Sequence, residues 1–407
     1  MGSFSTALSA MRAASEAVQA VGHNLANLNT AGFKKAEISF QEIVAASTQT
    51  GLGVTADANA RGFQQGAIQV TNRPLDAAIQ GAGFFLVRPA TAGATSGGAQ
   101  TLLTRDGRFF VGADGSIMTA GGARVQGWRL DTSTNAVNPS GPVQDLLAPL
   151  GTTLPAKPTT RVSIAANLDA SAAPGATLKI PLDVYDAQGV SHPVTVTFAK
   201  QSPNTWSVGL ESPDPAVVQP LPQVSPVSLT FTNGLLDSST PGALSVGAIA
   251  LKNNAGQLGP LTLSLDPASF TQYSQPSALL SVTQDGAPPA TLSDVRIGDG
   301  GKLIAVYSTG AESEIGRLAL VSVRNPESLV AVSDNYYQPG GDTFLLPPAI
   351  AGYQSCGNII GGALEGSNAD LADQFTQLLT YQRGYQAGAR AITANDELMQ
   401  EALSLLR

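Results

Sequence analysis

The sequence predicts a multi-domain, mainly β protein in which two or more all-β domains are flanked by α-helices at the N- and C-termini. Three observations lead to this fold class. The 407-residue chain exceeds what one hydrophobic core usually serves. Both ends carry apolar residues at a seven-residue period, and the stretch between them alternates short apolar runs with Asp-Gly, Asn-Gly and Pro turns. We therefore expect a coiled-coil-like helical domain, an inner β domain and an inserted outer β domain.

The N-terminal segment has the pattern of an amphipathic helix over residues 4–28. One apolar position recurs every seven residues, and a neighbouring stripe fills the same face. These seam positions are Phe4, Met11, Val18 and Leu25, followed on the neighbouring stripe by Leu8, Val21 and Leu28. Residues 29–32 (NTAG) favour a C-cap and a turn, so the helix is expected to end there.

The C-terminal segment holds one heptad position without a break, at Leu364, Leu371, Leu378, Tyr385, Ile392, Met399 and Leu406. The second seam position is half polar, which favours a helix with several neighbours over a two-stranded zipper. Residues 367–370 (SNAD) contain candidates for its N-cap. Gly384 and Gly388, four residues apart, form a small-residue stripe where another backbone is expected to pack closely. Since neither terminal helix can bury its apolar face alone, we expect the two to pack together and against further copies.

Pro-rich stretches near residues 154–158 and 286–289 bracket one segment of strands, which reads as an inserted domain. We expect residues 1–30 and 363–407 to form the terminal helical domain. Residues 31–74 are expected to form an extended linker with a β-hairpin. Residues 75–156 and 291–362 would build the inner β domain, and residues 157–290 the outer one.

The composition argues against several classes of function. The formal net charge is −8 and no basic run exceeds Lys34-Lys35, so neither a nucleic-acid groove nor a polybasic membrane patch is expected. No stretch approaches the ~20 apolar residues that span a bilayer. The N-terminus also lacks a basic region followed by an apolar one, so we expect a soluble chain without an ordinary secretory signal.

No catalytic, cofactor or metal site is expected. The only histidines are His23, inside the N-terminal helix, and His192, directly before a proline, and a structural role is favoured for both. The single cysteine, Cys356, is interpreted as a small buried apolar residue. Residues 81–83 (GAG) lack the third glycine of a dinucleotide fingerprint, and residues 297–301 (IGDGG) lack the alternating acidic ligands of a calcium loop.

Both ends of the chain resemble the bacterial flagellar rod and hook proteins, the axial family of the flagellum. The N-terminal resemblance lies in residues 20–27 (AVGHNLAN) and 29–34 (NTAGFK), although His23 stands where the family usually has Asn. The C-terminal resemblance lies in residues 362–371 (GALEGSNADL) and 381–387 (YQRGYQA). Interior stretches narrow it to the hook proteins: residues 73–79 (RPLDAAI), 83–85 (GFF), 184–189 (VYDAQG) and 284–286 (QDG), with Trp206.

The resemblance implies a subunit that polymerises with itself into a short curved tube, a universal joint between the rod and the filament. It also implies export through the flagellar export apparatus without a cleaved signal. The implied partners are the distal rod protein, the hook cap and the hook–filament junction protein, with no nucleic acid and no membrane insertion. The inserted outer domain is the feature that separates a hook protein from the shorter distal rod protein.

Two alternatives remain open at this point. The first is a distal rod or junction component, which shares the terminal helices and forms a straight or very short assembly. The second is a secreted β-rich protein that binds or hydrolyses carbohydrate and oligomerises through its helical ends. That function requires a cleft with paired carboxylates in residues 157–290.

Overall fold

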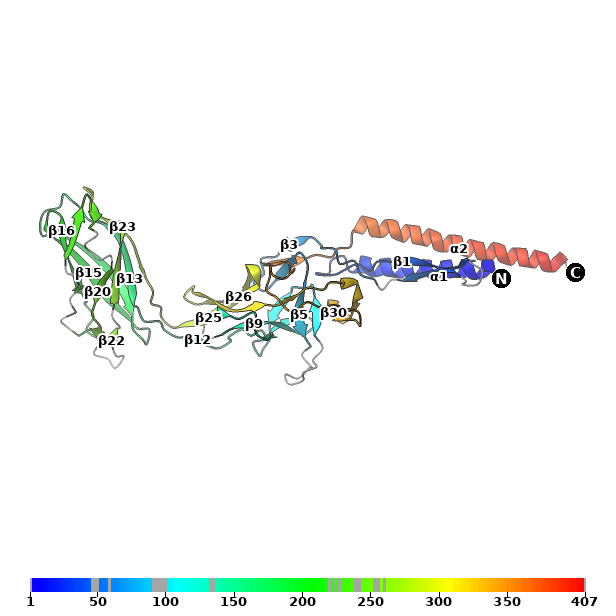
Figure 1. The fold of residues 1–407 in the computed structure, drawn as a ribbon, viewed down its shortest axis with the longest axis horizontal. Helices are drawn as coiled ribbons and strands as arrows, with labels where there is room; N and C mark the ends of the chain where they lie inside the picture. The colour runs from blue at the N-terminus through cyan, green and yellow to red at the C-terminus, as the bar shows by residue number, and fades with distance from the viewer. Residues whose placement is uncertain are drawn as a thin grey trace. The chain divides into compact units, whose positions relative to one another are not determined.

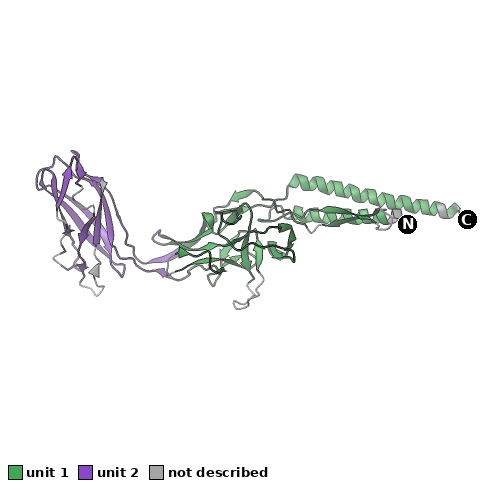
Figure 2. Cartoon of the chain, in the orientation of Figure 1, with its two compact units in different colours: residues 1–150, 293–306, 312–407 green, residues 151–292, 307–311 purple. Residues whose placement is uncertain are grey.

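The computed structural model describes residues 2–44, 51–57, 60–89, 101–131, 136–218, 221–222, 224–225, 228–237, 243–251, 257–258 and 261–405. The chain divides into two compact units, shown in different colours in Figure 2. Unit 1 contains residues 1–150, 293–306 and 312–407, and unit 2 contains residues 151–292 and 307–311. Unit 2 is therefore an insertion into unit 1.

The two long helices of unit 1 are α1 (Gly2–Ala26) and α2 (Leu371–Leu405). They lie side by side although they come from opposite ends of the chain (Figure 1). Asp370 caps α2, because its carboxylate accepts hydrogen bonds from the backbone N–H groups of Ala372 and Asp373 at 2.9 and 3.0 Å. No helix in the described part of the chain is both long and apolar enough to cross a membrane.

A two-stranded hairpin, β1 (Ser39–Val44) and β2 (Gly51–Asp57), packs along the helices (Figure 1). The backbone N–H of Val54 donates to Ser9 Oγ on α1 at 3.1 Å. The ring of Phe40 lies 5.8 Å from the ring of Tyr381 on α2. An isolated hairpin is at best marginally stable in water, so these contacts with both helices support it.

The rest of unit 1 is built on an extended sheet in the order β25-β26-β27-β9-β5-β6-β30-β29. Its apolar core gathers Phe84, Leu103, Trp128, Val321 and Tyr337. The strands are β5 (Phe84–Arg88), β6 (Leu102–Thr104), β7 (Phe109–Val111), β8 (Ile117–Thr119), β9 (Arg124–Asp131), β10 (Ala136–Val137), β11 (Gln144–Asp145), β25 (Ala290–Gly298), β26 (Lys302–Tyr307), β27 (Glu312–Leu318), β28 (Leu320–Val321), β29 (Leu329–Ala331) and β30 (Tyr336–Pro339), with 3-10 turns η1 (Asp299–Gly301), η2 (Pro326–Ser328) and η3 (Ser333–Asn335).

Two small antiparallel sheets bring the C-terminal part of unit 1 back beside its N-terminal part. β3 (Ile68–Val70) pairs with β32 (Ala363–Glu365), and β4 (Ala77–Gln80) pairs with β31 (Asn358–Gly361). These pairings place the chain that leads out of α1 next to the chain that leads into α2.

Unit 2 contains a sheet in the order β14-β15-β16-β18-β19-β23-β13-β24 around a core that includes Phe198, Trp206 and Phe270. Strand β15 alternates inward and outward residues, as expected for a strand with one buried face. The strands are β12 (Thr153–Leu154), β13 (Arg161–Asn167), β14 (Thr177–Tyr185), β15 (Ser191–Ser202), β16 (Thr205–Glu211), β17 (Val224–Ser225), β18 (Ser228–Thr232), β19 (Leu235–Leu236), β20 (Ala243–Val246), β21 (Ile249–Ala250), β22 (Gln257–Leu258), β23 (Leu261–Thr271) and β24 (Ala278–Gln284).

The predicted fold class is confirmed, since the described chain is mainly β with one helix at each end. Turn chemistry was also predicted well. Asn233 and Gly234, both with positive φ (53° and 82°), join β18 to β19 as a primed turn requires. The division into four parts stays a prediction, because the terminal helices and the β sheets of residues 60–150 belong to one compact unit.

The expected N-cap at residues 367–370 agrees with the structure, since Asp370 caps α2, but the placing of Leu364 on the helix was wrong. Leu364 lies in β32, where it pairs with Gln69, and α2 begins only at Leu371. The backbone N–H of Gly366 bonds to the carbonyl of Ala67 at 2.8 Å, so strand pairing continues past Leu364 in place of a helix. At the other end of the chain α1 ends at Ala26, and Leu28 lies in the turn that follows.

Candidate assembly site

The buried face of α1 consists mainly of alanines. Ala13, Ala17 and Ala20 are almost or fully buried, and Val21 has no exposed surface. The helix packs against both β2 and α2. Small side chains let both neighbours approach the helix backbone closely, which a row of leucines would prevent.

The predicted seam of α1 lies along the edge of this alanine face. Leu8, Met11, Val18 and Leu25 are each half-buried, as is Leu28 in the turn. Part of their apolar surface therefore remains free in a single subunit. The side chain of Phe4 lies outside the described part of the structure.

The predicted seam of α2 is largely uncovered in the single subunit. Leu371 is 51% exposed, Tyr385 43% and Met399 65%, whereas Leu378 and Ile392 are half-buried. Other large apolar side chains on the same helix are also exposed, namely Phe375, Leu379 and Leu398. Leu364 is half-buried in β32, and Leu406 lies outside the described residues. A helix that exposes several large apolar side chains is typical of a protein–protein contact.

The two glycines of α2 differ in their surroundings. A Cβ added at Gly388 would lie 3.5 Å from Met11 Cβ and 3.6 Å from the carbonyl oxygen of Ala7, so Gly388 sits at the contact with α1. At Gly384 nothing lies within 4 Å of an added Cβ. The predicted close packing at Gly384 is therefore not made inside the subunit and stays a prediction for contacts between copies.

Polar contacts fix α1 at its C-terminal end and α2 at its N-terminal end, where each helix joins the β part of unit 1. The side chain of Asn24, 1% exposed, accepts from the backbone N–H of Ala36 at 2.8 Å and donates to its carbonyl at 3.0 Å. Asn24 Nδ2 also donates to Gln374 Oε1 on α2 at 3.0 Å. One buried amide thus connects α1, the chain that follows it and the first turns of α2.

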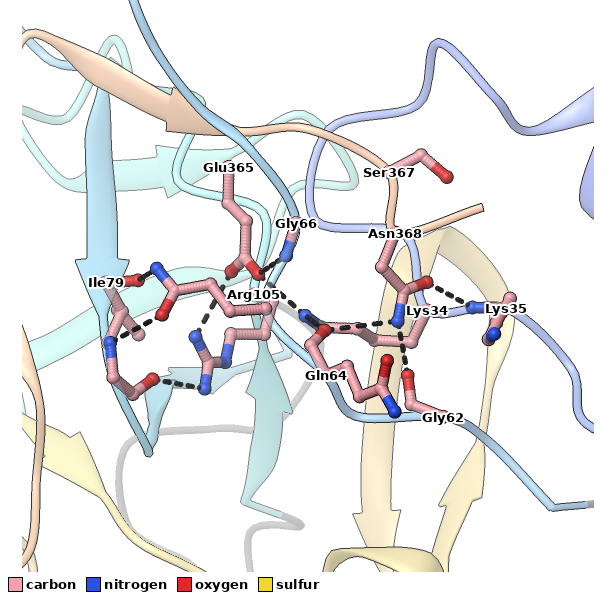
Figure 3. Close-up of polar contacts among 12 residues, drawn as sticks. Lys34, Lys35, Gly62, Gln64, Gly66, Ile79, Arg105, Glu365, Ser367 and Asn368 are labelled. Atoms are coloured by element: carbon pink, nitrogen blue, oxygen red, sulfur yellow. Dashed lines mark hydrogen bonds and ion pairs between the residues drawn. The ribbon is translucent and has the colours of Figure 1, made fainter. Parts of the chain in front are cut away.

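Beside this contact lies a group of three buried charged residues, which we call the ion node: Lys34, Arg105 and Glu365 (Figure 3). Lys34 Nζ lies 2.6 Å from Glu365 Oε1, and Arg105 Nη1 lies 3.1 Å from Glu365 Oε2. The Lys34 and Glu365 side chains have no exposed surface, and Arg105 is 5% exposed. Burial is the main cause that lowers the pKa of Lys34 and of Arg105, and Glu365 opposes the shift in both.

Backbone groups complete the ion node. Lys34 Nζ donates to the carbonyl of Gln64 at 2.7 Å, and Arg105 Nη2 donates to the carbonyl of Gly81 at 2.8 Å. Glu365 Oε1 also accepts from the backbone N–H of Gly66 at 2.9 Å. Two cations thus share one carboxylate, and one backbone carbonyl accepts a further hydrogen bond from each of them, whereas Arg105 Nε is buried without a hydrogen-bond partner.

Asn368 lies next to the ion node, just before α2 (Figure 3). Its Oδ1 accepts from the backbone N–H of Lys35 at 2.8 Å, and its Nδ2 donates to the carbonyls of Gly62 and Gln64 at 2.5 and 3.1 Å. These contacts tie the chain that enters α2 to the chain that leaves α1.

Sequence reasoning did not assign a role to Asn24, Lys34, Arg105 or Glu365. In the sequence Lys34 stands out only as half of a basic pair and as the last residue of the family motif at residues 29–34. One signal in the sequence could have pointed to Glu365. Only 13% of the residues are charged, so a charged residue directly after apolar ones, as in residues 363–365 (ALE), is unusual in this chain.

The residues considered for chemistry have structural surroundings. His192 is 1% exposed and lies between two carboxylates, with Nδ1 2.5 Å from Asp214 and Nε2 3.4 Å from Asp186. The ring of His23 packs edge-on against Phe33 at 5.5 Å. Cys356 is buried, as predicted, and burial raises the pKa of its thiol. Among the described residues, no group of three or more His, Cys, Asp or Glu is placed to hold a metal ion.

His23 also lines a cavity of about 470 Å³ in unit 1, together with Asp106 and Arg108. Arg108 binds both carboxylate oxygens of Asp106, with Nε to Oδ1 at 3.1 Å and Nη2 to Oδ2 at 2.7 Å. The hydrogen bond to Asp106 is the main cause that raises the pKa of Arg108. The carboxylate of Asp106 is therefore held in an ion pair.

Four family models match successive parts of the chain. The model of flagella basal body rod proteins matches residues 4–34, and that of the flagellar hook protein FlgE/F/G D1 domain matches residues 78–167. The flagellar basal body protein FlaE D2 domain matches residues 153–287, and the C-terminal model of flagellar basal body rod FlgEFG proteins matches residues 360–405. The terminal matches cover α1 from residue 4, the ion node residues Lys34 and Glu365, and α2.

Whole-length relatives are curated flagellar hook proteins FlgE. The protein of Borreliella burgdorferi is 30% identical over 95% of both chains, and that of Rhizobium meliloti is 30% identical over 100% of this chain and 99% of its own. The protein of Treponema pallidum is 29% identical over the full length of both chains. A solved structure of Helicobacter pylori flagellar hook protein FlgE2 covers 72% of this chain at 16% identity with a TM-score of 0.48. On the whole-length matches, this chain belongs to the flagellar hook protein family.

Proposed function

We propose that the chain is a structural subunit that polymerises through its terminal helices into the flagellar hook, a curved and flexible tube. The observation that supports this most strongly is the apolar surface that α2 leaves uncovered, with Leu371 51% and Met399 65% exposed. In a single subunit these side chains face water. Packing against copies of α1 and α2 would bury them, as the seams Phe4 to Leu28 and Leu371 to Leu406 predict.

The type of contact determines the shape of the assembly. A head-to-tail contact that does not close produces a helical tube, whereas a closing contact produces a ring. Burying an apolar side chain of the Leu class contributes about 1.5–3 kcal/mol, and ordering the chain costs a similar amount. Association is therefore favourable where many such side chains are buried together, and we expect α1 and α2 of a free subunit to be loosely ordered only beyond the contacts of Asn24 with Ala36 and Gln374.

Unit 2 is proposed to form the exchangeable outer contacts of the tube. Its charged surface groups include the exposed pair Lys179–Glu211, in which the two side chains are 56% and 60% exposed. Exposed ion pairs contribute only about 0–1 kcal/mol, so contacts of this kind break and re-form at little cost. A tube that bends as it rotates and transmits torque requires such contacts.

By its family the subunit is placed in the flagellum, and we propose the finer steps as follows. The chain is made in the cytoplasm and exported through the flagellar export apparatus without a cleaved signal peptide. It then adds beneath a hook cap, between the distal rod protein and the hook–filament junction protein. Deleting the export apparatus in the source bacterium tests this route, because the full-length chain would then remain inside the cell.

We also propose that the subunit has no enzymatic role. Among the described residues of unit 2, the carboxylates of Asp186 and Asp214 enclose His192, which is 1% exposed. Asp186 itself is 0% exposed. Only Asp214, with 14% of its side chain exposed, reaches the surface, and the burial of Asp186 and His192 argues against the carbohydrate hydrolase considered from the sequence.

Electron microscopy of the purified full-length chain, polymerised in vitro, tests the proposed function. Curved tubes are the expected product. A straight or very short assembly would favour the alternative of a distal rod or junction component. Subunits that stay monomeric at high concentration, under conditions in which the folded chain is stable, would contradict both.

A further inference from the structure

The segment that follows α1 and the segment that precedes α2 are joined directly by hydrogen bonds and an ion pair. The backbone N–H of Gly32 donates to the carbonyl of Glu365 at 2.8 Å, and the backbone N–H of Lys35 donates to Asn368 Oδ1 at 2.8 Å. Lys34 and Glu365, separated by 331 positions in the sequence, form a direct ion pair. The segment just after α1 and the segment just before α2 are therefore held at one place.

Arg105 attaches this place to the β sheets of unit 1. It follows β6, donates to Glu365 and to the carbonyl of Gly81, and its guanidinium lies 5.3 Å from the centre of the Phe84 ring. Phe84 belongs to the apolar core of unit 1. The ion node thus connects the bases of both helices, meaning the C-terminal end of α1 and the N-terminal end of α2, to the apolar core of the unit 1 sheet.

At two glycines beside the ion node, the surrounding backbone leaves no room for a side chain. Gly32 has φ +68°, and a Cβ there would lie 2.5 Å from the backbone nitrogen of Asp106. A Cβ at Gly66 would lie 2.1 Å from the carbonyl oxygen of Gly366. Both contacts are too short for any side chain, so the backbone segments at the ion node pack directly against each other.

The charges of the node suit positioning better than stabilisation. Two buried cations face one carboxylate, and burying charged groups costs free energy even when they are paired. A well-packed apolar group of the same volume would hold the segments with less desolvation. Directional ion pairs and hydrogen bonds, in contrast, fix the angle and register at which segments meet.

We propose that Lys34, Arg105 and Glu365, together with Asn368, are positioning residues for assembly. They hold the bases of α1 and α2 together on the sheets of unit 1 before the helices pair. Pairing of α1 with α2 then occurs within one molecule, between helices whose ends at the ion node are already adjacent. Little further chain entropy is therefore lost when they pair. This inference rests on the proposed polymerisation through the terminal helices, and it adds that chain order in the free subunit extends to the ion node.

Lys34→Met tests the proposal, because methionine keeps an unbranched chain while removing the charge and the hydrogen bonds. Lys35→Met is the matched control, since Lys35 is the neighbouring lysine, is partly exposed and has only a 4.0 Å contact with Glu37. Its bond to Asn368 uses the backbone and survives the substitution. Both variants are made in the full-length chain.

The first measurement is hydrogen exchange of the free subunit by mass spectrometry. In the parent chain and in Lys35→Met, we expect residues 363–368 to exchange slowly, at rates near those of β5 and β9. In Lys34→Met we expect exchange at residues 363–368 to be at least tenfold faster, with β5 and β9 unchanged. Equal protection in the two variants would overturn the proposal. Faster exchange of β5 and β9 as well would assign Lys34 a role in general stability only.

The second measurement is the subunit concentration needed for polymerisation. We expect at least a tenfold increase for Lys34→Met and less than a twofold change for Lys35→Met. Glu365→Gln, which leaves both buried cations without a carboxylate, should raise this concentration further. If the parent chain forms no tubes, the proposed function fails, yet the exchange experiment still decides whether the node orders the helix bases. If tubes form equally well from all variants, the node has no role in assembly.

Discussion

Replacing Leu371 by Asp is expected to weaken assembly strongly while leaving the free subunit folded. Leu371 is 51% exposed, so about half of its side chain remains to be buried when copies meet. Burying that half contributes about 1 kcal/mol, taken from the ~1.5–3 kcal/mol of a fully buried leucine. An aspartate loses this term and adds at least a similar cost for placing a carboxylate in an apolar contact. The total of about 2 kcal/mol or more raises the required subunit concentration by about 30-fold or more.

The position of Leu371 makes the test specific. It is the first residue of α2, where a negative charge favours the helix, so the variant does not weaken the helix itself. Thr376→Asp is the control, because Thr376 is exposed and lies about 140° further round the helix at 3.6 residues per turn. Sedimentation of assembled material over a concentration series gives the threshold. Equal thresholds for Leu371→Asp and Thr376→Asp would refute the seam, and Leu378→Asp is expected to behave like Leu371→Asp.

Three further predictions concern stability. Asn24→Ala leaves the backbone N–H and carbonyl of Ala36 without their partners, so the unfolding free energy of unit 1 should fall by about 2–4 kcal/mol in denaturant titrations; an unchanged midpoint would contradict this. Trp206→Ala removes a fully buried side chain and should lower the stability of unit 2 by about 3–5 kcal/mol, with the unit 1 transition unmoved in calorimetry; a shift of both transitions would show that the units unfold together. Burial opposes ionisation of Asp285, but hydrogen bonds, the strongest from the backbone N–H of Arg161, lower its pKa from 3.8 to about 2. Because its pKa is lowered in the folded state, the ionised Asp285 carboxylate stabilises the folded chain above pH 3.8. This contribution is lost as the pH falls toward 2. Asp285→Asn should therefore lose less stability over that interval, and identical pH profiles would refute the assignment.

The fold class followed from the sequence because each element carries a local signal. The terminal helices have an apolar period that strands cannot reproduce, and the turn at Asn233-Gly234 requires residues that tolerate positive φ. The end of the strand region was misplaced because Leu364 fits the heptad by spacing alone. Pairing of β32 with β3, which holds Leu364 in a strand, is a long-range interaction that no local pattern contains.

The candidate site was predicted only in part, for two physical reasons. A heptad pattern detects large apolar residues, whereas the face of α1 that is buried inside the subunit is made of alanines such as Ala13 and Ala17. Alanine suits both buried and exposed helix positions, so its spacing carries little information. The ion node joins Lys34 to Glu365 across 331 positions and Arg105 to Glu365 across 260, and only the folded chain brings these residues together.

A helical reconstruction of the in vitro polymer by electron cryo-microscopy tests the central claim most directly. We predict that α1 and α2 of each subunit pack against the same helices of neighbouring copies. Leu371, Tyr385 and Met399 should be buried in these contacts, and the pairing at Lys34 and Glu365 should be retained. A polymer in which these three α2 side chains remain in solvent, with unit 2 making the contacts that hold subunits together, would contradict assembly through the terminal helices.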